Sequence, residues 1–141
     1  MKFSNYYHLG RSTEVEVCQI LQRLGWKTKL SPGSKGPADI HADKNERKWC
    51  IQVKFRGDGI RTLTWSEESQ LMAHSTKCGC KPIVAIVTRY PGGLLLNASN
   101  VRDDKNPFVI RKKSGSFFAI EIDHNTALFF YSLLGGGKIE P

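Results

Sequence analysis

The segment at residues 48–56 constrains the fold more than any other part of the chain. Its side chains alternate in character, with one apolar set and one largely polar set. The apolar set is Trp49, Ile51, Val53 and Phe55, and the other set is Cys50, Gln52, Lys54 and Arg56. Because successive side chains of a β-strand point to opposite faces, this pattern predicts a strand with one face in the core. Its other face can then line a cleft.

The remaining segments predict strands and helices around this one. The continuous β-rich run at 82–87 is typical of a strand buried on both faces. We expect further strands at 26–31, 38–43, 93–98, 107–113 and 116–122. Helix-like apolar spacing begins at Val17 after a Thr13–Glu16 capping box and stops at Gly25. A second helix should run from Ser66 to near Gly79, and a last helix from Asp123 to about Leu134. This order predicts an α/β fold, a mixed sheet flanked by helices.

The net charge of the chain indicates a polyanionic partner. Among 141 residues, 21 are Lys or Arg and 13 are Asp or Glu, a formal charge of +8. The basic excess lies mainly within residues 1–94, which suits a binding face better than a tail. Nucleic acid is therefore the favoured partner, and a charge that serves only solubility is the alternative.

The sequence also excludes membrane-spanning and secreted proteins. The longest apolar runs, 83–87 and 127–131, are far shorter than the roughly 18 residues that span a bilayer. The first eight residues contain no apolar stretch of the kind found in signal peptides. We therefore expect a cytoplasmic protein, nucleoid-associated or of viral or phage origin.

The predicted hairpin of strands 38–43 and 48–56 brings together a set of polar side chains. With a loop at 44–47, Asp39 lies opposite Gln52, and Lys54 shares the face of Gln52. A carboxylate and an amide oxygen suit Mg²⁺, and a lysine can orient water or stabilise a phosphate. An ordinary exposed hairpin has the same composition, so the spacing alone leaves both interpretations open.

The cysteines offer a weaker metal signal. His74, Cys78 and Cys80 are zinc-type ligands, but no second Cys/His pair stands at zinc-finger spacing. The favoured interpretation is two small residues in a Cys-Gly-Cys turn.

Four elements together resemble a known family. They are Glu14, the loop at 31–36, Ala38-Asp39-Ile40 and Ile51-Gln52-Val53-Lys54. In this order they resemble the PD-(D/E)xK nuclease core, and most closely the archaeal-type Holliday junction resolvases. The resemblance covers 10–56 and 66–87 and fades after about 98. It implies a restriction-endonuclease-like mixed central sheet flanked by helices.

The resemblance also implies roles for individual residues. Glu14, Asp39 and Gln52 would bind Mg²⁺, with Mn²⁺ as a substitute. Lys54 would position the attacking water or the scissile phosphate, and Ser31 or Ser34 would touch the phosphate. The residues that we expect to contact DNA are Lys2, Tyr6, Tyr7, His8, Arg11, Lys35, Arg56 and Arg61. A frayed N-terminus and a solvated turn at 56–61 are the structural alternatives.

The expected organisation is one nuclease domain, 1–141. It comprises a basic-aromatic arm at 1–10, a nuclease core at 11–98, and C-terminal strands and a helix at 99–141. Because junction resolution needs two symmetric cuts, the family resemblance implies a homodimer. The apolar segments 94–96 and 128–131 are candidate dimer contacts, and core packing is the favoured explanation for them.

Gln52 departs from the family pattern, which usually has Glu at this position. The amide keeps an oxygen but loses the negative charge, so metal affinity should fall. Three explanations remain open: an active site of the Mrr type, which resembles this chain in using Gln; a replacement introduced to stop cleavage; or a naturally weakened, binding-only protein.

The function that the resemblance implies is a metal-dependent, structure-selective DNA endonuclease that resolves four-way junctions by paired symmetric nicks. The alternatives are an Mrr-like endonuclease acting on duplex DNA and a catalytically weakened junction-binding protein.

Overall fold

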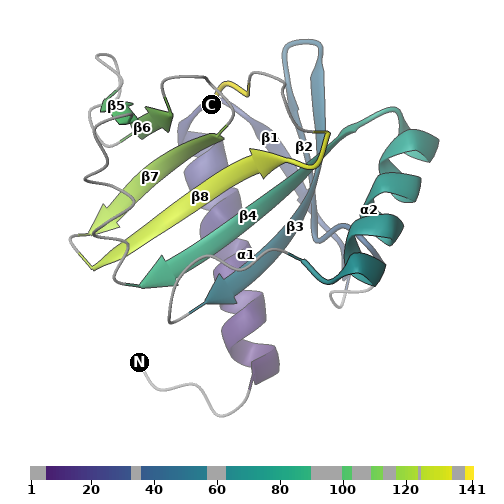
Figure 1. Ribbon diagram of the computed structural model, residues 1–141, viewed down its shortest axis with the longest axis horizontal. Coiled ribbons are helices and arrows are strands. Elements are labelled where there is room, and N and C mark those ends of the chain that lie inside the picture. The colour runs from purple at the N-terminus through teal and green to yellow at the C-terminus, as the bar shows by residue number, and fades with distance from the viewer. Residues whose placement is uncertain are drawn as a thin grey trace.

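The computed structural model describes residues 6–32, 36–56, 63–89, 100–102, 109–112, 117–123, 125–134 and 139–141. The helices are α1 (Tyr6–Arg23) and α2 (Trp65–Cys78). The strands are β1 (Lys27–Leu30), β2 (Ile40–Lys44), β3 (Arg47–Arg56), β4 (Lys81–Arg89), β5 (Asn100–Arg102), β6 (Val109–Lys112), β7 (Phe117–Asp123) and β8 (Thr126–Ser132). They form one mixed sheet in the order β1-β2-β3-β4-β8-β7-β6-β5 (Figure 1). The predicted α/β class, a mixed central sheet flanked by helices, is confirmed.

Strand β3 lies between an antiparallel and a parallel neighbour. It pairs with β2 in the predicted register, which places Ile40 opposite Ile51 and Asp43 opposite Lys48. The connecting turn is tighter than the expected loop, because only Asn45 and Glu46 lie between the strands. Its other neighbour, β4, runs parallel, and α2 supplies the crossover that a parallel pair requires.

The two faces of β3 are covered by different helices. Trp49, Ile51 and Val53 belong to the larger core cluster, which includes the inner side of α1. Cys50 belongs to the cluster on the opposite face, together with Leu71 of α2. Figure 1 shows α1 crossing behind the sheet while α2 stands beside β3. The alternation that the sequence predicted is therefore confirmed, with its apolar face under α1.

The predicted helix ends agree with the structure where a local capping residue defines them. Gly25, at φ 95°, follows α1, and the Trp26 N–H donates to the Leu21 carbonyl at 2.9 Å. Helix α2 starts one residue before the expected Ser66, where Thr64 and Glu67 form a capping box. Neither described helix has the length and apolar character needed to cross a membrane.

The start of α1 differs from the prediction. The helix begins at Tyr6, so Thr13 lies inside it and is buried. A capping hydroxyl belongs at an open helix end, and the Thr13–Glu16 capping box is therefore wrong. Residues 6–10 of the expected arm are helical, and residues 1–5 lie outside the described residues.

The predicted last helix at 123–134 is also wrong. Strand β8 occupies this segment and pairs antiparallel with both β4 and β7. The uninterrupted apolar run at 127–131 does not distinguish a buried strand from a buried helix. The sheet decides, because β8 satisfies the backbone hydrogen-bonding groups of β4 that would otherwise be buried without partners.

The position of β8 removes one candidate dimer contact. Leu128 and Phe130 are buried in the cluster under α1, and Phe129 is buried on the opposite face. The favoured core-packing explanation for 128–131 is thus confirmed. The predicted strands at 107–113 and 116–122 correspond to β6 and β7, whereas that at 93–98 and the apolar segment 94–96 lie outside the described residues.

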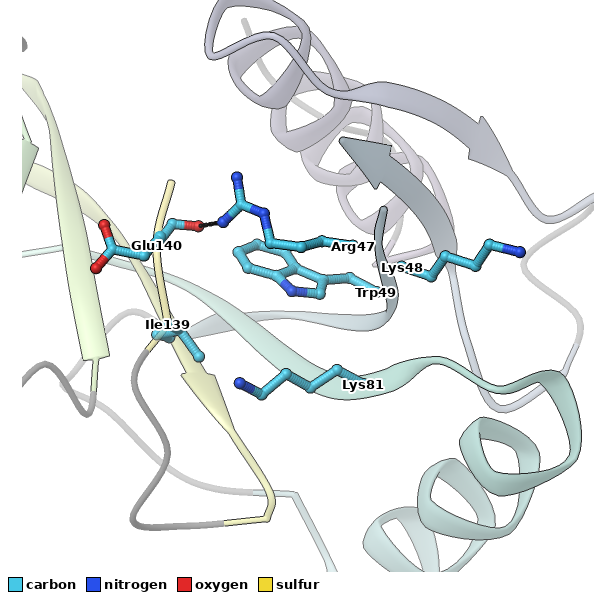
Figure 2. A pocket seen from close by; sticks show the side chains of 6 residues that line it. All are labelled: Arg47, Lys48, Trp49, Lys81, Ile139 and Glu140. Atoms are coloured by element: carbon cyan, nitrogen blue, oxygen red, sulfur yellow. Dashed lines mark hydrogen bonds between the residues drawn. The ribbon is translucent and has the colours of Figure 1, made fainter. Parts of the chain in front are cut away.

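The last described residues are tied to the β2–β3 hairpin. Figure 2 shows Arg47 donating to the backbone carbonyl of Glu140, at 3.1 Å, beside Trp49. Lys44 donates to the carbonyl of Pro141 at 3.1 Å, and Arg111 pairs with the Glu140 carboxylate at 2.6 Å. Residues 139–141 therefore brace the hairpin at the end opposite Lys54.

The aromatic core around Trp49 generates a stability prediction. Trp49 is 3% exposed, and its ring centroid lies 4.1 Å from that of Trp26. We expect Trp49→Ala to lower the free energy of unfolding by about 3–5 kcal/mol through lost burial and the cavity that remains. Denaturant unfolding followed by circular dichroism measures this change.

Trp65 supplies the matched control because its side chain is 83% exposed. Trp65→Ala should change the unfolding free energy by no more than about 0.5 kcal/mol. Equal effects of the two substitutions would contradict the described core.

Candidate active site

Asp39 lies immediately before β2, at the end of the β2–β3 ladder. Its Oδ2 accepts the Val53 N–H at 2.9 Å, and its own N–H donates to the Ile51 carbonyl at 2.8 Å. The regular ladder thus begins at Ile40, and the expected direct pairing of Asp39 with Gln52 is absent from the described register. The carboxylate takes the place of a backbone acceptor, and this fixes its position.

Glu14 meets Asp39 from α1. Both carboxyl groups are buried, with Glu14 6% and Asp39 4% exposed, and their side chains are hydrogen-bonded. Burial, with the neighbouring Glu14 carboxylate, raises the pKa of Asp39 to about 7, although the Val53 N–H opposes this shift. Two buried carboxyl groups in contact avoid mutual repulsion by holding a proton or by binding a cation.

Lys54 joins this pair from β3. Its ammonium forms an ion pair with Glu67 of α2, and its charge also acts on Asp39. Although burial alone would raise the pKa of Glu67, hydrogen bonds from Lys54 and the Thr64 N–H hold it below its ordinary value. Lys54 is therefore held between an acid of α2 and the buried acids.

Glu67 is a site residue that the sequence prediction missed. By position it is an acid in the first turn of α2, where the helix dipole accounts for it. Its three-residue spacing from Thr64 marks a capping box, and this box places its carboxylate at the end of α2 nearest Lys54. The pairing with Lys54 depends on how α2 packs against β3, which no local spacing specifies.

Gln52 lies on the same side of β3 as Lys54. Its side chain is half-buried, and its backbone stands in register with Val84 of β4. The donor set of Glu14, Asp39 and Gln52 consists of oxygen ligands, the kind that Mg²⁺ prefers. A cation relieves the repulsion between two buried carboxyl groups, so these residues fit a divalent metal ion.

Ser31 connects the preceding loop to the site. Its hydroxyl donates to the Ala38 carbonyl at 2.6 Å, and its N–H donates to the Asp39 carbonyl at 2.8 Å. In this arrangement Ser31 holds the backbone of Asp39 in place.

Several predicted DNA-contacting residues are not described at the level of side chains. Lys2, Ser34, Lys35 and Arg61 lie outside the described residues. For Tyr6, Tyr7, His8 and Arg11 the structure describes only their place in α1, and for Arg56 only its place in β3.

Comparisons with known proteins connect this geometry to a family. No family model matches the chain. Over 132 residues it is 26% identical to the crossover junction endodeoxyribonuclease Hjc of Methanocaldococcus jannaschii, covering 94% of this chain and 91% of that protein. The solved structure of Archaeoglobus fulgidus Hjc, a Holliday junction resolvase, matches with a TM-score of 0.49 and 25% identity, over 53% of this chain and 64% of that one. Similarity along almost the whole of both sequences makes this chain a homologue of archaeal Hjc, as the motif residues indicated.

Proposed function

We propose that this protein is a metal-dependent, structure-selective DNA endonuclease that resolves four-way junctions by paired symmetric nicks. The observation that carries the proposal is the buried Glu14–Asp39 carboxyl pair beside Lys54, assembled from three separate segments. Such an acidic site within a chain of net charge +8 fits a phosphodiester substrate. The homology to a crossover junction endodeoxyribonuclease specifies the class of substrate.

In this proposal Glu14, Asp39 and Gln52 hold Mg²⁺, with Mn²⁺ as a substitute. When bound, the ion would supply Lewis-acid stabilisation of the phosphate and would lower the pKa of the attacking water. The water oxygen attacks phosphorus in line, the bond to the 3′ oxygen breaks, and the product carries a 5′-phosphate. Lys54 stabilises the charge that develops on the phosphate, and Glu67 positions its ammonium for this role.

Recognition of the DNA follows from charge and shape in this proposal. Lys2, Tyr6, Tyr7, His8, Arg11, Lys35, Arg56 and Arg61 are the proposed contacts to phosphates and unpaired bases. Phosphate contacts position DNA without reading its sequence, which suits a branched substrate. Two nicks related by symmetry require two sites, so we propose a homodimer acting on DNA in the cytoplasm.

The first test compares a synthetic four-way junction with a linear duplex of the same sequence. With Mg²⁺ we expect paired nicks in the junction, and with EDTA we expect none, as resolved on denaturing gels. Cleavage of the linear duplex as fast as the junction would instead support the Mrr-like alternative.

Gln52 favours one second candidate, a junction-binding protein with weakened catalysis. An amide at this position provides one negative charge fewer for a metal ion than the usual glutamate. The variant Gln52→Glu separates the two functions in the same assay. Cleavage that appears only in the variant, with tight junction binding by both proteins, would establish the binding function for the protein with Gln52.

Lys54 provides a test of the site assignment. We expect Lys54→Ala to reduce the rate of junction cleavage by about 10²–10³-fold, because the charge on the transition state loses its partner. Single-turnover cleavage at saturating protein measures this rate.

Lys48→Ala is the matched control, since Lys48 is an exposed lysine near the start of the same strand. Its cleavage rate should stay within a few-fold of the natural protein. Equal losses in the two variants would place the role of Lys54 in general DNA affinity rather than in catalysis.

The buried carboxyl pair predicts a pH dependence of the metal-free protein. The pKa of Asp39 is about 7 in the folded state against an ordinary value of 3.8. Its ionisation therefore destabilises the fold as the pH rises from about 4 to 7. In EDTA, the melting temperature of Asp39→Asn should exceed that of the natural protein by a margin that is larger at pH 8 than at pH 5.

Saturating Mg²⁺ should reduce or reverse this margin, because metal binding favours the ionised carboxylate. Asp43→Asn, at an exposed position of β2, serves as the control. A margin for Asp39→Asn that does not change with pH would contradict the described carboxyl contact.

A further inference from the structure

A second cluster of ligating side chains lies apart from the carboxyl pair. The ring nitrogens of His41 and His74 and the sulfur of Cys50 all lie within 4.8 Å of one another. His41 Nε2 and His74 Nε2 are 2.9 Å apart. The Sγ of Cys78 lies 3.6 Å from the same nitrogen of His74. Three side chains that commonly bind transition metals therefore meet at one point, and Cys78 lies next to one of them, His74.

The fold explains why these residues meet. His41 and Cys50 are direct cross-strand partners in the β2–β3 ladder, so their side chains share one face. His74 and Cys78 are four residues apart near the end of α2, so they share one side of that helix. Because α2 packs on this face of the sheet through Leu71, the two pairs face each other.

Two of the ligand separations lie close to those of tetrahedral coordination. Zinc–nitrogen bonds of about 2.0–2.1 Å and zinc–sulfur bonds of about 2.3 Å imply ligand separations of roughly 3.3 Å for two nitrogens and 3.6 Å for nitrogen and sulfur. The separation of Cys78 Sγ from His74 Nε2 matches the second value. That of the two imidazoles is shorter by a few tenths of an ångström, which a small ring rotation corrects.

The ligand chemistry separates this cluster from the carboxyl site. Thiolate and imidazole ligands favour Zn²⁺, whereas carboxylate and amide oxygens favour Mg²⁺. Cys50 is fully buried and His74 half-buried, so the cluster is partly shielded from solvent. The sequence indicated His74, Cys78 and Cys80 alone. The β2–β3 hairpin supplies the second pair of ligands, His41 and Cys50, although the chain has no zinc-finger spacing.

We propose that His41, Cys50, His74 and Cys78 form a structural Zn²⁺ site that fastens the end of α2 to the β2–β3 hairpin. The site joins segments more than thirty residues apart, as the His41–His74 contact shows. It lies at the opposite end of α2 from Glu67, which contacts Lys54. Binding the ion therefore fixes α2 at one end while the ion pair with Lys54 holds the other.

Cobalt and zinc alone serve as probes. Reduced protein, freed of metal by chelator dialysis, is titrated with Co²⁺ and then with Zn²⁺. We expect one equivalent of Co²⁺ to produce thiolate-to-cobalt charge-transfer absorption and the intense visible bands of a tetrahedral ion, and Zn²⁺ to abolish both. One equivalent of Zn²⁺ should also raise the melting temperature, because the ion binds the folded state.

Variants assign the ligands. His74→Ala and Cys50→Ala should each lose the charge-transfer band or weaken Co²⁺ binding at least a hundredfold, with the circular dichroism spectrum retained. Cys18→Ala is the matched control, since Cys18 is a buried thiol of α1 on the other side of the sheet. Asp39→Asn should keep the band, because the carboxyl site contains no thiolate.

Three results would overturn the proposal. Co²⁺ could bind without a charge-transfer band, which would place it at the oxygen ligands. The band could survive His74→Ala at unchanged affinity. Freshly reduced protein could bind no Co²⁺ at all, which would leave the two histidines as a hydrogen-bonded pair.

Discussion

The burial of β3 under a different helix on each face is the constraint on which the rest of this structure depends. One face carries Trp49, Ile51 and Val53 into the core with α1, so the strand cannot rotate or slip by one residue without exposing them. The opposite face then has fixed places for Cys50, Gln52 and Lys54. Helix α2 covers that face and also makes the connection to the parallel strand β4. Core packing and site geometry are thus two consequences of one alternation.

The carboxyl pair shows how this rigid frame sustains an unfavourable arrangement. Asp39 is held by the Val53 N–H and by its own backbone bonds to Ile51 and Ser31. These contacts keep its carboxyl group beside Glu14 even though burial and like charge disfavour ionisation there. Binding a cation stabilises a site of this kind, and without the cation the buried carboxyl groups lower the stability of the folded protein. In the proposed function the acidic residues bind the metal ion, and the net charge of +8 favours the binding of DNA.

Prediction succeeded where a local rule was sufficient. The register of β2 and β3 followed from alternation and the position of the turn, and the end of α1 followed from Gly25. It failed at Thr13, because a threonine three residues before Glu16 fits a helix cap, whereas Thr13 lies inside a longer helix. It failed again at β8, where an apolar run fits a helix and a strand equally well and only the open edge of β4 selects the strand. In both cases the deciding contact lies far away in the sequence.

The sequence by itself determined the two-faced strand, the hairpin register, the family resemblance and the identity of Glu14, Asp39, Gln52 and Lys54 as candidate site residues. The two-faced strand and the hairpin register depend on spacing within short segments, which side-chain periodicity encodes directly, whereas Glu14 and the roles of the site residues came from the family resemblance. Only the tertiary structure decided that Asp39 contacts Glu14, that Glu67 pairs with Lys54, and that His41 and Cys50 face His74 and Cys78. Each of these contacts joins side chains from elements whose mutual packing is set by burial of the whole core. No spacing along the chain records such packing.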